Sequence, residues 1–297
     1  MSLRAEAAQE STLLKIPRRI EPLVEAGLVD SVIHQLMSGK EATIYLVRCG
    51  DEIRCAKVYK EADQRSFRQS VDYTEGRKVR NTRRARAMEK GSRYGRKAKE
   101  EAWQSAEVNA LAHLAAAGVR VPQPYNFIDG VLLMELVTDS EGNAAPRLND
   151  VVFTPEQARE VHGVLIREVV RMLCAGIVHG DLSEYNVLFG SEGPVIIDLP
   201  QAVDAAGNAH AGKMLERDVA NLAGYFGRFA PELLDTEYGK EIWSLYKSAK
   251  LRVETELTGR FEREEKPVDV KGVLRVVDDA LKEEAARQRY RQEMARK

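Results

Sequence analysis

The pattern of apolar and polar positions in the first 60 residues predicts a small β-sheet. Three segments are rich in β-branched and apolar residues and are expected to be successive strands: 29–38, 42–48 and 53–59. Polar turns join them at residues 38–40 and at Gly50-Asp51. Residues 1–28 are expected to form a short helical extension interrupted by prolines.

Apolar positions further along predict a helix followed by a hairpin. The Ala-rich segment 100–117 is typical of a helix, and Gly118 can end it. Asp129-Gly130 lies between two apolar runs, which is a strong local signal for a tight turn. We therefore expect a hairpin over 127–137.

A second helix has a well-marked start. Thr154 can cap it, Pro155 suits its first turn, and Gln157 can complete a capping box. Large apolar residues then recur at helical spacing: Val161, Leu165, Val169 and Leu173. Beyond Asp218 the chain is expected to be helical and to end in a highly charged segment from about Lys282.

This order of elements predicts an α+β protein with two lobes. We expect an N-terminal lobe over 29–137, made of an antiparallel sheet and one helix. A mostly helical C-terminal lobe is expected over 138–297, with a hinge near residues 135–139.

Composition narrows the class of protein. The chain has 297 residues, 44% of them hydrophobic and 31% charged, which is typical of a globular protein with ample core. Its three cysteines, at 49, 55 and 174, lack the spacing of a disulfide framework or a zinc site. No apolar run reaches the roughly 20 residues that span a bilayer. Residues 2–10 lack the apolar core of a signal peptide, so we expect a cytoplasmic protein that does not contact a membrane.

Charge is concentrated in one stretch, residues 60–99. It holds fourteen Lys or Arg residues against five Asp or Glu residues, whereas the whole chain has a formal net charge of −1. We expect a flexible loop, because few apolar residues are available to anchor it. The loop is either merely solvated or binds RNA or a ribosomal particle, through residues such as Arg83-Arg84 and Arg96-Lys97, with salt-dependent affinity.

The residues that carry chemistry gather between His179 and Asp198. Apolar runs on both sides of a Gly-rich turn predict a hairpin whose open end brings Asn186 and Asp198 side by side. Their oxygens suit Mg²⁺, which uses few protein ligands together with phosphates and waters. Asp181 is expected to orient an attacking hydroxyl and accept its proton. His179 is expected to tie the loop to neighbouring backbone.

Two further segments fit an ATP site. Lys57 lies in the third strand, where a fixed cation could contact phosphates, and Glu107 is the natural acidic partner. Glu100 and Glu101 are competitors near the start of the helix, where the dipole alone favours acids. The turn Ser38-Gly39-Lys40-Glu41-Ala42 could cover phosphates with backbone N–H groups, although it matches no P-loop.

These motifs resemble the RIO family of atypical serine/threonine protein kinases. The resemblance rests on the Ser38–Ala42 turn, the Lys57 strand, the string His-Gly-Asp-Leu-Ser-Glu-Tyr-Asn at 179–186 and Asp-Leu-Pro-Gln at 198–201, and it covers roughly 29–230. Such proteins have a trimmed, two-lobed kinase fold that lacks an activation loop. About thirty residues precede the first strand, so the shorter, bacterial-type branch without a winged-helix domain fits better.

The resemblance also implies roles for individual residues. Lys57 would bind phosphates, Asp181 would be the catalytic Asp, and Asn186 and Asp198 would bind Mg²⁺, or Mn²⁺ in its place. Met134 would flank the adenine pocket, and backbone groups of Glu135 and Val137 would pair with the base. The segment 60–99 would be the family's flexible loop.

The function expected from the sequence is an ATP- and Mg²⁺-dependent serine/threonine protein kinase with an unknown protein acceptor. Some family members act instead as ATPases that pass phosphate to the metal-binding Asp, here Asp198. A small-molecule phosphotransferase of the aminoglycoside or choline kinase type is an alternative, since it also uses His-Gly-Asp, a later Asn and a further Asp. A binding factor for RNA or ribosomes is the third hypothesis.

Overall fold

The computed structural model describes residues 16–60 and 106–261. The described residues up to Arg260 belong to one compact unit. Three predicted features fall wholly or mostly outside the described residues: the N-terminal extension up to residue 15, the basic loop and the charged segment from Lys282. The lobe boundary at residues 137 and 138 stays a prediction.

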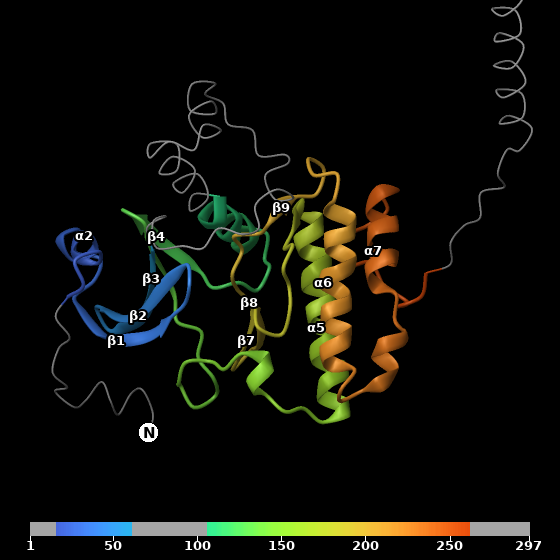
Figure 1. The fold of residues 1–297 in the computed structure, drawn as a ribbon, viewed down its shortest axis with the longest axis horizontal. Coiled ribbons are helices and arrows are strands. Elements are labelled where there is room, and N and C mark those ends of the chain that lie inside the picture. The colour runs from blue at the N-terminus through green and yellow to red at the C-terminus, as the bar shows by residue number, and fades with distance from the viewer. Residues whose placement is uncertain (1–15, 61–105, 262–297) are drawn as a thin grey trace, which may run out of the picture. The chain divides into compact units, whose positions relative to one another are not determined.

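A five-stranded antiparallel sheet forms from the predicted strands (Figure 1). The strands are β1 (Ser31–Ser38), β2 (Ala42–Cys49), β3 (Glu52–Tyr59), β4 (Pro124–Ile128) and β5 (Val131–Glu135), in the order β1-β2-β3-β5-β4. Asp129 and Gly130 join β4 to β5 with φ angles of 47° and 76°. Two successive positive φ angles are what a two-residue type I′ turn needs, so the predicted hairpin is confirmed.

The two faces of the sheet pack against different partners. Ala56 and Val58 of β3 join a buried cluster with Leu23 of the short helix α2 (Glu21–Glu25). Tyr59 belongs to a second cluster that includes Leu111 of a helix described over residues 106–116. Because side chains alternate along a strand, Lys57 lies on the same face as Tyr59, toward that helix.

Three helices form the largest part of the remaining residues: α5 (Pro155–Cys174), α6 (Ala211–Phe226) and α7 (Tyr238–Lys247). They lie side by side (Figure 1). The predicted capping box of α5 is confirmed, since Gln157 N donates to Thr154 Oγ1 at 3.2 Å and Thr154 N donates to Gln157 Oε1 at 2.9 Å. Two short 3₁₀ helices accompany them: η2 (Leu148–Asp150) and η3 (Pro231–Asp235).

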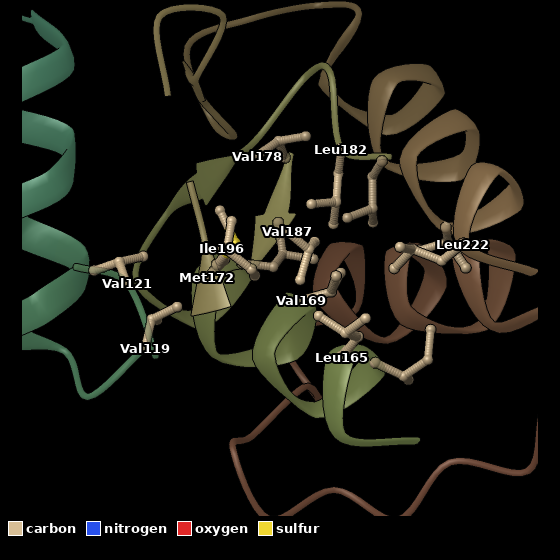
Figure 2. Packing of buried hydrophobic residues seen from close by; sticks show 14 of the residues in the cluster. Val119, Val121, Leu165, Val169, Met172, Val178, Leu182, Val187, Ile196 and Leu222 are labelled. Carbon is tan, nitrogen blue, oxygen red and sulfur yellow. The ribbon is translucent and has the colours of Figure 1, made fainter. Parts of the chain in front are cut away.

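Two small antiparallel pairs complete the described fold. One pairs β7 (Val187–Gly190) with β8 (Gly193–Ile196), and the other pairs β6 (Ile177–Val178) with β9 (Val203–Asp204). Figure 2 shows residues of the β7–β8 hairpin and the loop before it in one packed cluster with α5 and α6: Leu165, Val169, Leu182, Val187, Ile196 and Leu222. The hairpin is therefore anchored by buried apolar side chains.

The expectation of helix throughout the region beyond Asp218 is wrong for residues 248–261, which contain no helix. Gly259 has a φ of 70°, which helical backbone does not allow. Glu241 of α7 accepts hydrogen bonds from the amides of Thr258 and Gly259 at 2.8 Å each, so α7 holds this irregular segment in place. Among the described helices, none is long and apolar enough to cross a membrane.

Candidate active site

Lys57 of β3 is the centre of a chain of charges. Its Nζ lies 2.5 Å from Glu107 Oε1 and 3.3 Å from Asp198 Oδ1. The side chains of Lys57 and Glu107 are 13% and 5% exposed, so this contact is largely removed from water. Burial by itself would lower the pKa of Lys57, but the carboxylates of Glu107 and Asp198 outweigh it and raise the pKa above its usual value. Lys57 is therefore a fixed ammonium ion.

Asp198 and Asn186 meet at the open end of the β7–β8 hairpin, as the sequence predicts. Ile197 N donates to Asn186 O at 3.0 Å, which extends the pairing to the residue just before Asp198. Asp198 has a φ of 66°, a left-handed conformation that is uncommon for a residue with a side chain. The chain thus turns sharply here, and Asp198 meets Lys57 from the sheet.

Asp181 is an exposed residue of the loop between β6 and β7, and its neighbours Gly180 and Leu182 are buried. Its backbone is held on both sides, because its N–H donates to His179 Nδ1 at 3.3 Å and its carbonyl accepts from Asn186 Nδ2 at 2.7 Å. His179 Nε2 donates to Ile197 O at 3.0 Å. Burial lowers the pKa of His179 and so favours the neutral ring, whose two hydrogen bonds place the proton on Nε2. The predicted role of His179 in tying the loop to neighbouring backbone is confirmed.

Helix α6 holds the same loop, which the sequence did not reveal. Asp218 accepts hydrogen bonds from Gly180 N at 2.7 Å and from Leu182 N at 3.2 Å, the residues on either side of Asp181. Arg217 donates to Gly180 O, and Asn221 Nδ2 donates to Leu182 O at 3.0 Å. Asp218 is 1% exposed, and burial raises its pKa to about 7.

The turn between β1 and β2 is also fastened. Gly39 N donates to Ala42 O at 2.9 Å and closes the turn. Lys60 Nζ, just past the end of β3, donates to Gly39 O at 2.7 Å and to Ser38 Oγ at 3.3 Å. Ser38, Lys40 and Ala42 therefore lie on a turn that Lys60 ties to the end of β3.

The segment that follows β5 has part of its backbone already engaged. Glu135 N donates to Gln123 O, and Ala145 N donates to Val137 O, both at 2.9 Å. Met134 is half-buried in β5, opposite Cys55 of β3. These two bonds engage the amide of Glu135 and the carbonyl of Val137, but they do not use the carbonyl of Glu135 or the amide of Val137.

Comparison with protein families decides the identity. The model of the RIO domain matches residues 43–238, about two thirds of the chain. The chain belongs to the RIO family. The RIO-type kinase Rio1 of Haloferax volcanii is 37% identical over 212 residues, which cover 70% of this chain and 68% of the relative. The kinase rio1 of Schizosaccharomyces pombe is 29% identical over 212 residues, but this chain spans only 40% of its length.

A solved structure supports the fold. The Rio2 kinase of Chaetomium thermophilum, determined as an ADP/Mg²⁺–phosphoaspartate complex, superposes with a TM-score of 0.51 at 22% identity, over 71% of this chain and 59% of that chain. The expected two-lobed, kinase-like α+β fold of a RIO protein is therefore confirmed. The small-molecule phosphotransferase is not favoured by these comparisons.

The structure brings together five of the predicted site residues, and no described contact joins the Ser38–Ala42 turn or residues 134–137 to them. Lys57, Glu107 and Asp198 form one chain of contacts, and Asn186 joins it to Asp181 through the loop. Glu100 and Glu101, the competing partners of Lys57, lie outside the described residues. Asp218 and Asn221 are three residues apart and so share one face of α6, but this spacing alone does not indicate a contact with the Asp181 loop.

Proposed function

We propose that this RIO-family protein is an ATP- and Mg²⁺-dependent serine/threonine protein kinase whose transfer site is built by Lys57, Asp181, Asn186 and Asp198. The observation that carries the proposal is the contact of one ammonium group with two carboxylates, one from the sheet-associated helix and one from the hairpin. In phosphoryl transfer, a lysine held by a helix glutamate binds the nucleotide phosphates.

The nucleotide would lie between the sheet and the hairpin. Lys57 would contact its phosphates, and backbone N–H groups of the Ser38–Ala42 turn, among them that of Lys40, would donate to them as well. The adenine would pair with the Glu135 carbonyl and the Val137 amide beside Met134. The Glu135 amide and the Val137 carbonyl already form hydrogen bonds within the protein, which supports the Glu135 carbonyl and the Val137 amide as the groups that bind adenine.

Asn186 and Asp198 fit a hard divalent cation such as Mg²⁺, with Mn²⁺ as an alternative. Asn186 Nδ2 donates to Asp181 O, so Oδ1 is the atom of that side chain that can ligate a metal. Asp198 directs one oxygen toward Lys57, and its side chain is 45% exposed, which leaves room for a ligand at the other oxygen. When bound, the cation supplies neutralisation of the phosphate charge.

Asp181 is suited to handle the acceptor. Asp181 is exposed, and the backbone of residues 180–182 is held by six hydrogen bonds to neighbouring residues and α6. The hydroxyl oxygen of a serine or threonine would attack the γ-phosphorus as the bond to the bridging oxygen of ADP breaks. Asp181 would orient that hydroxyl and accept its proton.

Hydrolysis through Asp198 is the second candidate activity. The Rio2 structure that shares this fold carries a phosphoaspartate. In this route a carboxylate oxygen of Asp198 attacks the γ-phosphorus and ADP leaves. Water then attacks the phosphorus of the acyl phosphate and releases inorganic phosphate, which restores the carboxylate.

Labelling with [γ-³²P]ATP and Mg²⁺ distinguishes the two activities. We compare wild type with Asp181→Ala and Asp198→Ala, and use the exposed Asp235→Ala as the matched control. Acid-stable, hydroxylamine-resistant label on protein indicates a serine or threonine ester. Hydroxylamine-labile label that is absent from Asp198→Ala indicates the acyl phosphate. Unchanged turnover in Asp181→Ala would refute its catalytic role.

Binding of RNA or a ribosomal particle by residues 60–99 is a separate proposal. The charge of the segment in the sequence supports it. Neutralising Arg83-Arg84 and Arg96-Lys97 should lower RNA affinity and flatten its dependence on salt. RNA affinity and a salt slope that survive the change would rule this partner out.

A further inference from the structure

Arg120 lies where three parts of the fold meet. Its neighbours Val119 and Val121 are buried in the large apolar cluster (Figure 2), so the backbone of Arg120 is anchored on both sides. Its N–H donates to Glu168 Oε2 of α5 at 2.9 Å, and its carbonyl accepts from Ile196 N of β8 at 2.9 Å. Arg120 is thus attached to the helix core and to the hairpin that ends at Asp198.

The side chain of Arg120 reaches the residue after Met134. Its two terminal nitrogens donate to the two carboxylate oxygens of Glu135 at 3.0 and 2.8 Å, a bidentate pair. One of them also donates to Val121 O at 3.2 Å, and Gln123 N donates to Glu135 Oε2 at 3.0 Å. A fork of this geometry fixes direction as well as distance, which a lysine cannot do.

The attachment to α5 is itself firm. Glu168 is buried, and its second oxygen accepts a hydrogen bond from Arg171 at 2.6 Å. Both oxygens of this carboxylate are therefore used, one by the Arg120 backbone and one by Arg171. Helix α5 therefore holds the backbone of Arg120, and the bond to Val121 O helps to hold its guanidinium against Glu135.

We propose that Arg120 is a positioning residue that orients the Glu135 peptide for adenine and so sets the preference for ATP over GTP. The inference rests on the proposed function, in which the Glu135 carbonyl accepts the adenine amino group. Guanine presents a carbonyl oxygen at the corresponding place, which a fixed carbonyl repels. Loosening Glu135 should therefore weaken adenine binding and relax discrimination, without affecting the phosphates.

The test measures dissociation constants by calorimetry for three probes: MgATP, MgGTP and magnesium tripolyphosphate, which has no base. The proteins are wild type, Arg120→Ala, Arg120→Lys and Glu135→Gln. Arg159→Ala is the matched control, because Arg159 is an exposed arginine of α5 that pairs with Glu156 and Glu232 and not with a residue of the hinge segment 135–139. Circular dichroism checks that each variant is folded.

We expect Arg120→Ala to lose about tenfold in MgATP affinity, roughly the value of one charge-assisted contact. Its ratio of ATP to GTP affinity should fall, its tripolyphosphate affinity should stay at the wild-type value, and Glu135→Gln should shift the same ratio in the same direction. Equal losses for MgATP and tripolyphosphate would show a merely structural role and overturn the proposal. Unchanged discrimination in both Arg120→Ala and Glu135→Gln would overturn it too. A wild type that binds none of the three probes would instead overturn the proposed function.

Discussion

Asp218 makes stability depend on pH in a direction opposite to that of most carboxylates. Burial raises its pKa from 3.8 to about 7, so the folded state keeps a proton that the unfolded chain releases. Below pH 3.8 both states are protonated and the group contributes nothing. Between pH 3.8 and 7 the folded state binds more protons, so stability falls as the pH rises.

The magnitude follows from the two pKa values. Each pH unit inside the window costs about 1.4 kcal/mol, and linkage between pH 5 and pH 8 gives a total of about 2.5 kcal/mol. Asp218→Asn cannot ionise, so this component disappears. The variant should carry a constant penalty of about 1–3 kcal/mol, because its amide group can accept only one of the two backbone donors that Asp218 satisfies.

Urea unfolding at pH 5, 6, 7 and 8 measures the difference. The Asn variant should be clearly less stable than wild type at pH 5, and the gap should shrink by about 2.5 kcal/mol by pH 8. All other titrating groups cancel in the comparison, provided that the m-value is the same in both proteins. Parallel stability curves over this range would refute the inference that Asp218 is protonated in the folded protein near neutral pH.

Three further predictions concern stability. Glu107→Gln removes the more buried of the two carboxylates that contact Lys57 and should cost about 3 kcal/mol in urea unfolding, since Asp198 still compensates part of the charge. A cost below about 1 kcal/mol would show that the pair with Glu107 is not desolvated. Burial lowers the pKa of His162 to about 4, so the unfolded chain takes up the proton first and the free energy of unfolding of wild type should fall by about 3 kcal/mol between pH 6.5 and pH 4. His162→Leu should lack this loss, and an identical acid dependence in both proteins would contradict the prediction. Thr154→Ala removes the N-cap of α5 and should lower stability by about 1 kcal/mol in thermal denaturation, while Thr154→Ser should not; equal midpoints for Ala and Ser would argue against the cap.

Features encoded by a few neighbouring residues could be predicted from the sequence. The capping box at Thr154 and Gln157 and the turn at Asp129-Gly130 depend on local backbone geometry, and both form as expected. The ion pair of Lys57 spans 50 residues, yet it was also predicted, because a phosphate-binding lysine requires an acidic partner on the neighbouring helix.

The contacts of Asp218 and Arg120 could not be found in this way. Asp218 is one of two acids on α6, and nothing in the helix sequence distinguishes it from Glu216. Its role arises only when the fold buries it against a loop 36 to 38 residues earlier. Arg120 and Glu135 lie 15 residues apart and resemble an ordinary surface pair. The proposed role of this pair depends on Glu168 and Ile196, which form hydrogen bonds with the backbone of Arg120 and reach it only through tertiary packing.

The hydrogen bonds around Asp181 involve its backbone, whereas its proposed catalytic role involves its carboxylate. Every contact described for this residue is made by its backbone, and the neighbouring peptides are held by side chains of α6. Asp181 is exposed, and none of these hydrogen bonds uses its carboxylate. Position 181 should therefore tolerate almost any replacement in folding terms, so that an inactive variant would keep an intact acceptor surface and could serve as a trap for the protein that it phosphorylates.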